Sequence, residues 1–345
     1  MNWRSLQRSW LAQMVLWPLS LLYGAIVGAR VKAYRKGRSK QNRLRGAVVS
    51  VGNLTVGGAG KTPMVLWLAE KFLAQGQSVV ILSRGYRGKQ GSSDEVELLR
   101  ARLGARFGNS AVVAMGADRF ATGAAIEAKR PVDIFLLDDG FQHLQLARDV
   151  DILLMDASHP LTGESLLPAG LLREPVSAMA RADVLVFTRA EFQSEMSGLV
   201  SSLQSYPVFA ASTKLLGFHR LGREAGELLS AEQIGAGPFL AFCGLGNPQQ
   251  FYGDLTAWDF PVCGQKTFPD HHRYSASDVA ALERAASAAE AGAMITTEKD
   301  AKNLAGVNLE KFQVFVAVID IEVEHEEEFL SLIQLKIAAR LEAVS

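Results

Sequence analysis

The chain has 345 residues, of which 48% are apolar and 21% charged, a composition that excludes a disordered protein and suits one large or two ordinary domains. Its two cysteines, Cys243 and Cys263, are too few for a disulfide scaffold, and we expect both to be small core residues in a reducing compartment. The 36 basic and 36 acidic residues balance, but no acidic residue precedes Glu70, so we expect only the N-terminal end to be drawn to an anionic surface.

Residues 10–29 carry no charge and are followed by a basic tail, which contains Arg30, Lys32, Arg35, Lys36, Arg38, Lys40, Arg43 and Arg45. Twenty residues at about 1.5 Å each could just cross a hydrocarbon core of about 30 Å. The segment therefore predicts a single transmembrane helix, or an interfacial helix or hairpin broken at Pro18, which we favour slightly. A buried core helix of a soluble protein is the third alternative, and no cleavage pattern favours a signal peptide. Both membrane interpretations leave the rest of the chain in the cytoplasm, where ATP is.

A glycine-rich loop follows the first apolar run, AVVSVGN (47–53), and precedes an apolar pattern with helical spacing that ends at Gly76. Strand, loop and helix are the context of a phosphate-binding loop, here LTVGGAGKTP (54–63). Its glycines let several N–H groups point at one phosphate, Lys61 would reach the β- and γ-phosphates, and the hydroxyl of Thr62 would bind Mg²⁺. Thr55 stands where the general pattern has glycine, but GGxGKT is intact.

A second apolar run, 132–137, leads directly into Asp138 and Asp139, where a magnesium-binding carboxylate of a P-loop protein belongs. Further apolar runs at 79–83, 111–115, 150–156 and 183–189 predict a parallel sheet covered by helices. Arg119 and Arg173 are our candidates for side chains that clamp a phosphate, although either could instead form a surface ion pair.

Six motifs occur in order: VGNLTVGGAGKTP, SRGY (83–86), DDGFQH (138–143), LPAGLLRE (167–174), DHH (270–272) and TEKDAK (297–302). Together they resemble the tetraacyldisaccharide 4′-kinases, the lipid A 4′-kinases of Gram-negative bacteria, over nearly the whole chain. The resemblance implies transfer from ATP, with Mg²⁺, to the 4′-hydroxyl of an acylated glucosamine disaccharide 1-phosphate at the cytoplasmic face of the inner membrane. It also implies two α/β domains joined by a short β linker, with the active site between them.

The resemblance assigns roles to particular residues of this chain. The family's nucleotide loop falls on Thr55, Val56, Gly57, Gly58, Ala59, Gly60, Lys61 and Thr62. Its acidic pair matches Asp138 and Asp139, and its Arg-Glu pair matches Arg173 and Glu174, of which we add only Glu174 to the magnesium ligands. The catalytic carboxylate would be Asp94, although Ser93 and Val96 depart from the family's pattern there. The histidine that pairs with it would be His271, which we favour over His272 because it directly follows Asp270. A carboxylate that accepts the proton of a sugar hydroxyl contributes about 10²–10⁴-fold. Lys299 and Asp300 match a family motif without a role that we can derive.

The second half predicts an extended linker at 206–236 and then a smaller α/β domain at 237–345. Its GLGNP (244–248) lacks a lysine and is expected to be a plain turn from strand to helix. The predicted domains are thus a membrane-associated helical segment (1–45), a P-loop nucleotide-binding α/β domain (46–205), the linker and the C-terminal domain. We expect no nucleic-acid partner, and the sequence indicates no protein partner.

Two other classes share a P-loop. A membrane-associated partition-type ATPase would act as a switch without a lipid acceptor, but that class favours a lysine where this chain has Val56. A transport or assembly ATPase would hydrolyse ATP regardless of any glycolipid. A non-enzymatic adaptor is disfavoured by the intact Lys61, Thr62 and Asp139.

Overall fold

A computed structural model describes residues 10–85, 94–158, 161, 164–190, 206–223, 227–235, 237–304, 306–307, 309 and 311–342. Its chain divides into two compact units. The first comprises Met1–Gly91, Leu99–Ser212 and Glu322–Ser345, and the second Ser92–Leu98 and Thr213–Ile321. The last residues therefore group with the first unit, whereas the sequence predicts one C-terminal domain from 237 onward. The C-terminal helix explains this grouping, because Phe329 packs against Trp67 and Phe209 of the first unit.

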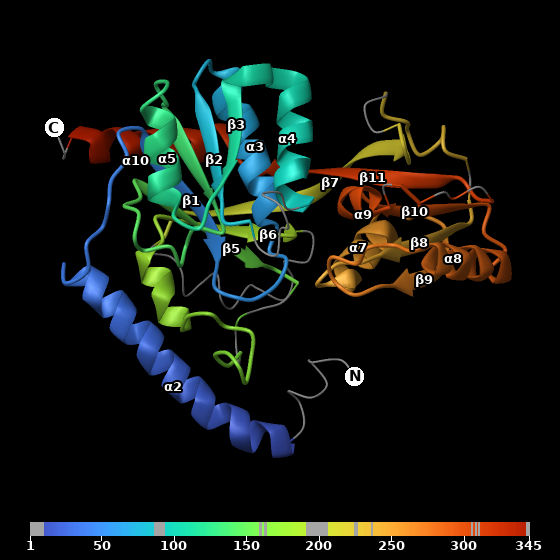
Figure 1. Ribbon diagram of the computed structural model, residues 1–345, viewed down its shortest axis with the longest axis horizontal. Coiled ribbons are helices and arrows are strands. Elements are labelled where there is room, and N and C mark those ends of the chain that lie inside the picture. Colours follow the sequence, from blue (N-terminus) through green and yellow to red (C-terminus); the bar gives the residue numbers. More distant parts are fainter. Residues whose placement is uncertain are drawn as a thin grey trace. The chain divides into compact units, whose positions relative to one another are not determined.

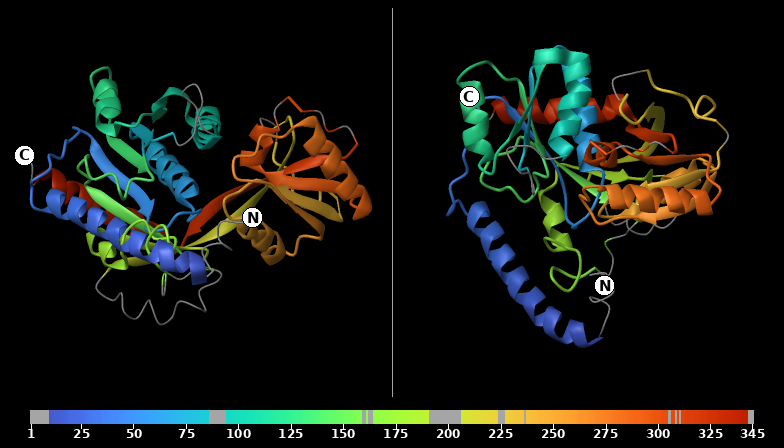
Figure 2. Two further views of the ribbon diagram at one scale, coloured as in Figure 1. Left: turned by 60° about the horizontal axis from the view of Figure 1, so that its bottom comes forward. Right: turned by 45° about the vertical axis from the view of Figure 1, so that its right-hand side comes forward.

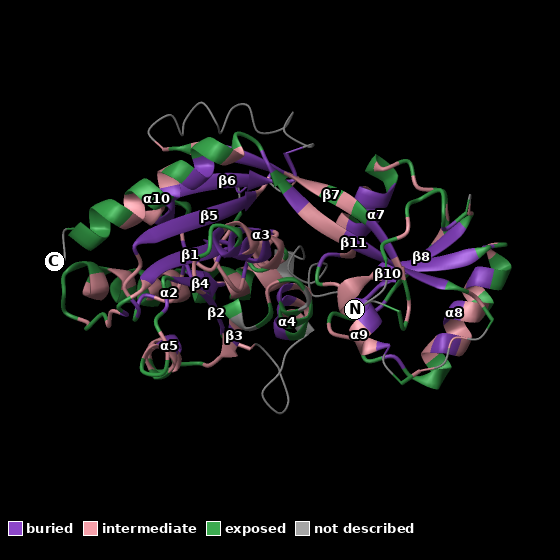
Figure 3. Cartoon of the chain, turned by 90° about the horizontal axis from the view of Figure 1, so that it is seen from above, coloured by how far each residue is buried: buried purple, intermediate pink, exposed green. Residues whose placement is uncertain are grey.

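Parallel strands form the sheet of the first unit, in the order β3-β2-β4-β1-β5-β6-β7 (Figure 1). The side chains of β1, β2, β4, β5 and β6 are almost entirely buried, as expected for apolar runs covered on both faces, whereas those of β3 and β7 are only partly buried (Figure 3). The bounds are β1 (Ala47–Asn53), β2 (Val79–Ser83), β3 (Ala111–Met115), β4 (Ile134–Asp138), β5 (Val150–Asp156), β6 (Val184–Thr188) and β7 (Val208–Arg220).

Helices cover both faces of this sheet. α5 packs on Val80, Leu82, Phe135 and Leu137 of one face, while α3 and α10 lie together on the other, joined by an ion pair between Lys71 and Glu326. The bounds are α2 (Trp10–Arg35), α3 (Lys61–Ala74), α4 (Asp94–Phe107), α5 (Arg119–Glu127), α10 (Glu326–Glu342) and the 3₁₀ turns η1 (Gly108–Ser110) and η2 (Val176–Arg181). The first residues of α4 group with the second unit.

The second unit contains a parallel sheet in the order β11-β10-β8-β9. Its elements are β8 (Phe239–Cys243), α7 (Pro248–Ala257), β9 (Val262–Thr267), α8 (Ala276–Ala288), β10 (Ala293–Thr297), α9 (Glu298–Asn303) and β11 (Val314–Val323). Cys243 is buried in this core as predicted, but Cys263 is exposed on β9, which corrects its predicted core position. β9 is the last strand of this order among the described residues, and most of its side chains are exposed.

The segment predicted as an extended linker contains β7, a 13-residue strand that pairs in parallel with β6. One further sequence prediction requires correction. The N-terminal apolar helix α2 is continuous for 26 residues, with Pro18 inside it, rather than broken there (Figure 2). A proline removes one backbone hydrogen bond of the helix, and here the contacts that α2 makes with the rest of the unit on both sides of Pro18 hold it together.

Candidate active site

The nucleotide loop leaves the carboxyl end of β1 and enters α3. Gly57 and Gly60 have φ angles of 136° and 75°, which only glycine adopts without strain. A side chain added to Gly57 would meet no atom of the described residues within 4 Å. Gly60 ends the loop as the residue before α3, so the free N–H groups of the first helical turn face the loop. This open cradle of amide groups beside an ammonium group fits the phosphates of a nucleotide.

Lys61 extends from the first turn of α3 back toward the end of β1. Its ammonium donates to Asn53 Oδ1 at 3.0 Å and to the Gly57 carbonyl at 3.4 Å, and it lies 3.5 Å from Asp139 Oδ1. The Asn53 side chain also donates to Thr55 Oγ1 at 3.1 Å, and the Asn53 backbone carbonyl accepts from Gln142 Nε2 at 2.9 Å. These contacts fix the lysine at the mouth of the loop.

The acidic pair stands beside the loop because β4 pairs with β1, with Asp138 opposite Val51. Asp139 turns the chain with a left-handed φ of 53°, and its carboxylate accepts from Arg173 Nη1 at 2.9 and 2.7 Å. Burial alone would raise the pKa of Asp139, but the positive charges of Lys61 and Arg173 outweigh it, so the pKa lies below its usual range. Asp139 therefore stays ionised at neutral pH, as a magnesium ligand must.

Arg119 is 3% exposed and contacts the backbone of the acidic turn formed by Asp138 and Asp139. Its guanidinium donates to the Asp138 carbonyl at 2.7 Å and to the Asp139 carbonyl at 3.1 Å. Burial lowers its pKa, and the two aspartates oppose that change. In this arrangement Arg119 holds the backbone of the turn, which places Asp139 toward Lys61.

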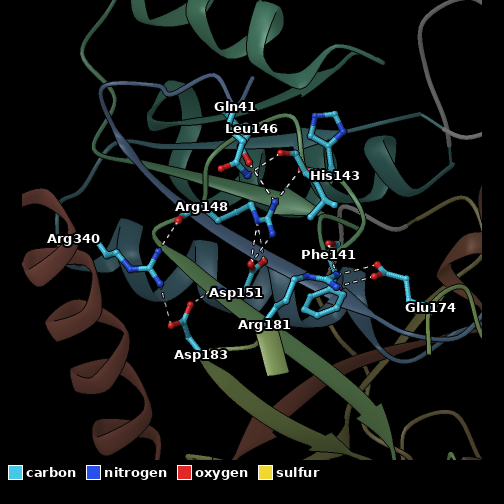
Figure 4. A network of polar contacts seen from close by, with 11 residues as sticks. Gln41, Phe141, His143, Leu146, Arg148, Asp151, Glu174, Arg181, Asp183 and Arg340 are labelled. Carbon is cyan, nitrogen blue, oxygen red and sulfur yellow. Dashed lines mark hydrogen bonds and ion pairs between the residues drawn. The ribbon is translucent and has the colours of Figure 1, made fainter. Parts of the chain in front are cut away.

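Glu174, which follows Arg173 in the chain, forms an ion pair with Arg181. Glu174 is 2% exposed, and both of its carboxylate oxygens accept from Arg181, at 2.7 and 3.0 Å (Figure 4). The Arg181 guanidinium lies 4.4 Å from the centre of the Phe141 ring. Glu174 is thus engaged with Arg181 at the place where the sequence predicts a magnesium ligand.

The structure gathers the predicted residues of the nucleotide loop, Arg119, Asp138, Asp139, Arg173 and Glu174 in the first unit. Thr62 lies in the first turn of α3, and the Ala59 carbonyl accepts from Thr188 Oγ1 at 3.2 Å. Asp94 begins α4, and its side chain lies outside the described residues. Among the described residues no group of three His, Cys, Asp or Glu side chains is arranged to hold a metal ion.

His271 belongs to the second unit and has a left-handed φ of 58°. Its Nε2 lies 3.4 Å from Lys299 Nζ, which also donates to Asp270 Oδ1 at 2.7 Å. Asp300, fully buried in the first turn of α9, accepts from the Thr297 and Tyr274 hydroxyls and from the Gly244 N–H, while Thr297 caps the helix by accepting from the Asp300 N–H. The TEKD motif, for which we derived no role from the sequence, therefore connects the GLGNP turn to the loop that carries His271.

Sequence reasoning missed Asn53, Gln142, Thr188 and Arg181. The first three follow or end strands at the edge of the sheet that carries the nucleotide loop, so their position after an apolar run was an available signal. Arg181 offers no such signal, because only the folding of η2 brings it to Glu174.

His143, the last residue of the DDGFQH motif, gives a test of this site's electrostatics. Burial, followed by the charges of Arg119 and Arg148, lowers its pKa from 6.5 to about 4. Between these two pH values the unfolded chain binds more protons, so stability should fall as the pH falls from 6.5 toward 4. We expect His143→Gln to reduce this loss by on the order of 1 kcal/mol, since the side chain is only partly buried. Urea unfolding of both proteins at pH 7 and pH 5 measures the difference, and equal losses would contradict it.

Comparison with known proteins agrees with this geometry. The family model described as tetraacyldisaccharide-1-P 4′-kinase (LpxK) matches residues 12–338. A tetraacyldisaccharide 4′-kinase of Syntrophobacter fumaroxidans is 40% identical over 312 residues, covering 85% of this chain and 80% of that protein. One from Geobacter metallireducens is 36% identical over 321 residues, with 88% and 92% covered. The crystal structure of LpxK from Aquifex aeolicus in complex with ATP aligns with a TM-score of 0.71 at 30% identity, covering 93% of this chain and 98% of that one. The chain therefore belongs to the tetraacyldisaccharide 4′-kinase family and is a P-loop kinase.

Proposed function

We propose that this kinase transfers the γ-phosphoryl group of ATP to the 4′-hydroxyl of a tetraacyl glucosamine disaccharide 1-phosphate, the lipid A precursor, at a membrane surface. The observation that carries the proposal is the cluster of Lys61, Asp139 and Arg173 around an open glycine loop, in a chain of this family. The names of the relatives supply the substrate class.

Positioning and charge neutralisation account for most of the catalysis in such a transfer. The loop amides and Lys61 bind the β- and γ-phosphates, while Thr62 and Asp139 would hold a Mg²⁺, which would supply positive charge to neutralise those phosphates. The Asp138 side chain is buried next to Asp139 in the chain. Because Glu174 is paired with Arg181, it is better suited to support the residues around the metal than to contact the metal directly. Arg173 keeps Asp139 oriented.

The acceptor hydroxyl must lose its proton as its oxygen bonds to phosphorus and the bond to the leaving ADP breaks. We propose that the Asp94 carboxylate accepts this proton and that His271 assists it. The ion pair of Lys299 with Asp270 supports His271 in its strained backbone conformation.

We further propose that α2 lies in the membrane surface. Its inner positions, 13, 16, 20, 23, 24 and 27, face the first unit, while Met14, Val15, Trp17, Leu21, Leu22 and Ile26 are each more than half exposed. By length and composition the stretch Ala12–Arg35 could cross a membrane, yet a spanning helix could not keep its polar inner contacts with the body of the unit. The exposed basic residues after it suit anionic headgroups on the cytoplasmic side.

The deciding experiment follows radiolabelled phosphate from ATP into tetraacyldisaccharide 1-phosphate in mixed micelles with Mg²⁺. We expect transfer to this acceptor and none to a 4′-deoxy analogue, because the hydroxyl is the nucleophile. Turnover of ATP that is the same with and without the glycolipid would favour the partition-type ATPase instead.

The exposed face of α2 gives a second test. Replacing Trp17 and Leu22 by glutamate places two charges where apolar side chains would enter the headgroup region. Each apolar side chain is worth about 1.5–3 kcal/mol on burial, so binding to anionic vesicles should fall by more than tenfold. Sedimentation with such vesicles measures this, with Glu327→Gln, an exposed position on α10, as the control. Unchanged binding of the double variant would place the membrane attachment elsewhere.

A further inference from the structure

The apolar helix α2 makes specific polar contacts with one loop, residues 165–173, within the first unit. Ser20, only 5% exposed, donates to the Leu166 carbonyl at 2.8 Å and accepts from the Ala169 N–H at 2.9 Å. Gln13 donates to the Ala169 carbonyl at 3.2 Å, and a side chain on Gly24 would lie 2.7 Å from Leu166. A helix that served only to hold the protein at a membrane would not require such a fitted inner face.

Tyr23 extends this contact to the active site. Its hydroxyl donates to the carbonyl of Arg173 at 2.9 Å, and burial raises its pKa, with the charges of Arg173 and Glu174 acting in opposite directions. Arg173 is the residue whose guanidinium holds both carboxylate oxygens of Asp139.

The same loop is joined to the mouth of the nucleotide loop. Leu172 pairs with Thr55, the Val56 N–H donates to the Leu171 carbonyl at 2.8 Å, and the Arg173 N–H donates to the Leu54 carbonyl at 2.7 Å. The loop closes on itself through the Leu167 N–H, which donates to the Leu172 carbonyl at 2.8 Å. Hydrogen bonds therefore connect α2, through this loop, to residues 54–56 and, through Arg173, to Asp139.

We propose that α2 is part of the catalytic scaffold, and that Tyr23 and Ser20 are positioning residues that act on the phosphoryl-transfer site through Arg173 and the 165–173 loop. The packing of α2 against this loop then determines the geometry of the site that holds ATP and Mg²⁺. The expected effect on kcat rests on the proposed function, whereas the expected effect on the affinity for ATP does not.

Tyr23→Phe removes one hydroxyl and leaves the apolar ring in place, so it tests the contact with little other change. We expect kcat to fall about three- to tenfold, the effect of one lost hydrogen bond, and the affinity for ATP with Mg²⁺ to weaken in the absence of lipid. The KM for the glycolipid and vesicle binding should not change, and the melting temperature should fall only slightly, as the loss of one hydrogen bond requires. The matched control is Tyr34→Phe, in the same helix about three turns further on, where no such effect is expected.

A double-mutant cycle separates positioning from general destabilisation. If Tyr23 acts through Arg173, Tyr23→Phe should have almost no further effect on kcat in an Arg173→Ala background, whereas independent effects would multiply. Ser20→Ala should weaken nucleotide affinity in the same direction as Tyr23→Phe. A Tyr23→Phe protein that matches Tyr34→Phe in both kcat and nucleotide affinity, or effects that multiply in the cycle, would overturn the inference. A wild-type protein that binds ATP but phosphorylates no glycolipid would count against the proposed function alone.

Discussion

Lys61→Ala should reduce phosphoryl transfer by about 10²–10³-fold, the range seen when one preorganised group that stabilises transition-state charge is removed. The lysine is the one side chain that contacts Asn53, the Gly57 carbonyl and Asp139 together, among the residues that the structure describes. Its removal leaves Asp139 with only Arg173 as a directly paired cation among these residues, so the acidic turn should also bind its metal in a less defined geometry.

The measurement is the initial rate of transfer from radiolabelled ATP, with kcat and the KM for ATP determined separately. A loss confined to KM would mean that Lys61 binds the ground state and the transition state equally. Lys129→Ala is the matched control, since Lys129 is exposed at the end of α5 in the same unit, and it should leave the rate within a factor of two. Activity of Lys61→Ala within a few-fold of wild type would contradict the assignment of this loop.

Asp151→Ala should lower the free energy of unfolding by about 3–5 kcal/mol, because it leaves a buried arginine without its counter-charge. The side chains of Arg148 and Asp151 are 7% and 9% exposed, and the guanidinium meets the carboxylate at 3.1, 3.0 and 2.8 Å (Figure 4). Arg148 also donates to the His143 carbonyl at 3.2 Å, so this ion pair supports the end of the DDGFQH motif.

The network extends to the C-terminal helix. Arg340 donates to the Arg148 carbonyl at 3.2 Å and to Asp183 at 3.3 Å, and Asp183 accepts from the Asp151 N–H at 2.9 Å. Urea unfolding of wild type, Asp151→Ala and the double variant Arg148→Met/Asp151→Leu tests the account. The double variant should regain most of the lost stability, since it removes both charges from the interior. A loss below 1 kcal/mol in Asp151→Ala would show that the pair is hydrated in solution.

The N-terminal half of the fold could be predicted from sequence because its parallel strands other than β7 are short apolar runs, which in β1, β2, β4, β5 and β6 are buried on both faces. The runs at 79–83, 111–115 and 150–156 coincide with β2, β3 and β5. β7 was predicted only as an extended segment and not as a strand of the sheet, since its burial varies along its length and its pattern gives no clear period. The continuity of α2 was missed for a different reason: a proline weakens a helix locally, and contacts far away in the chain decide whether it breaks.

The sequence by itself determined the chemistry of this protein. A phosphate and magnesium site forms wherever two suitable strands lie side by side. One strand is followed directly by glycines, a lysine and a threonine, and the other by two aspartates. Both spacings are local in the sequence. Only the tertiary structure decided how the site is held. Arg181 reaches Glu174 through a turn of the chain, Arg119 reaches the acidic turn from another element, and Tyr23 reaches Arg173 across 150 positions. Hydrogen bonds of this kind depend on the packing of elements distant in sequence, and no periodicity or motif of the chain encodes them.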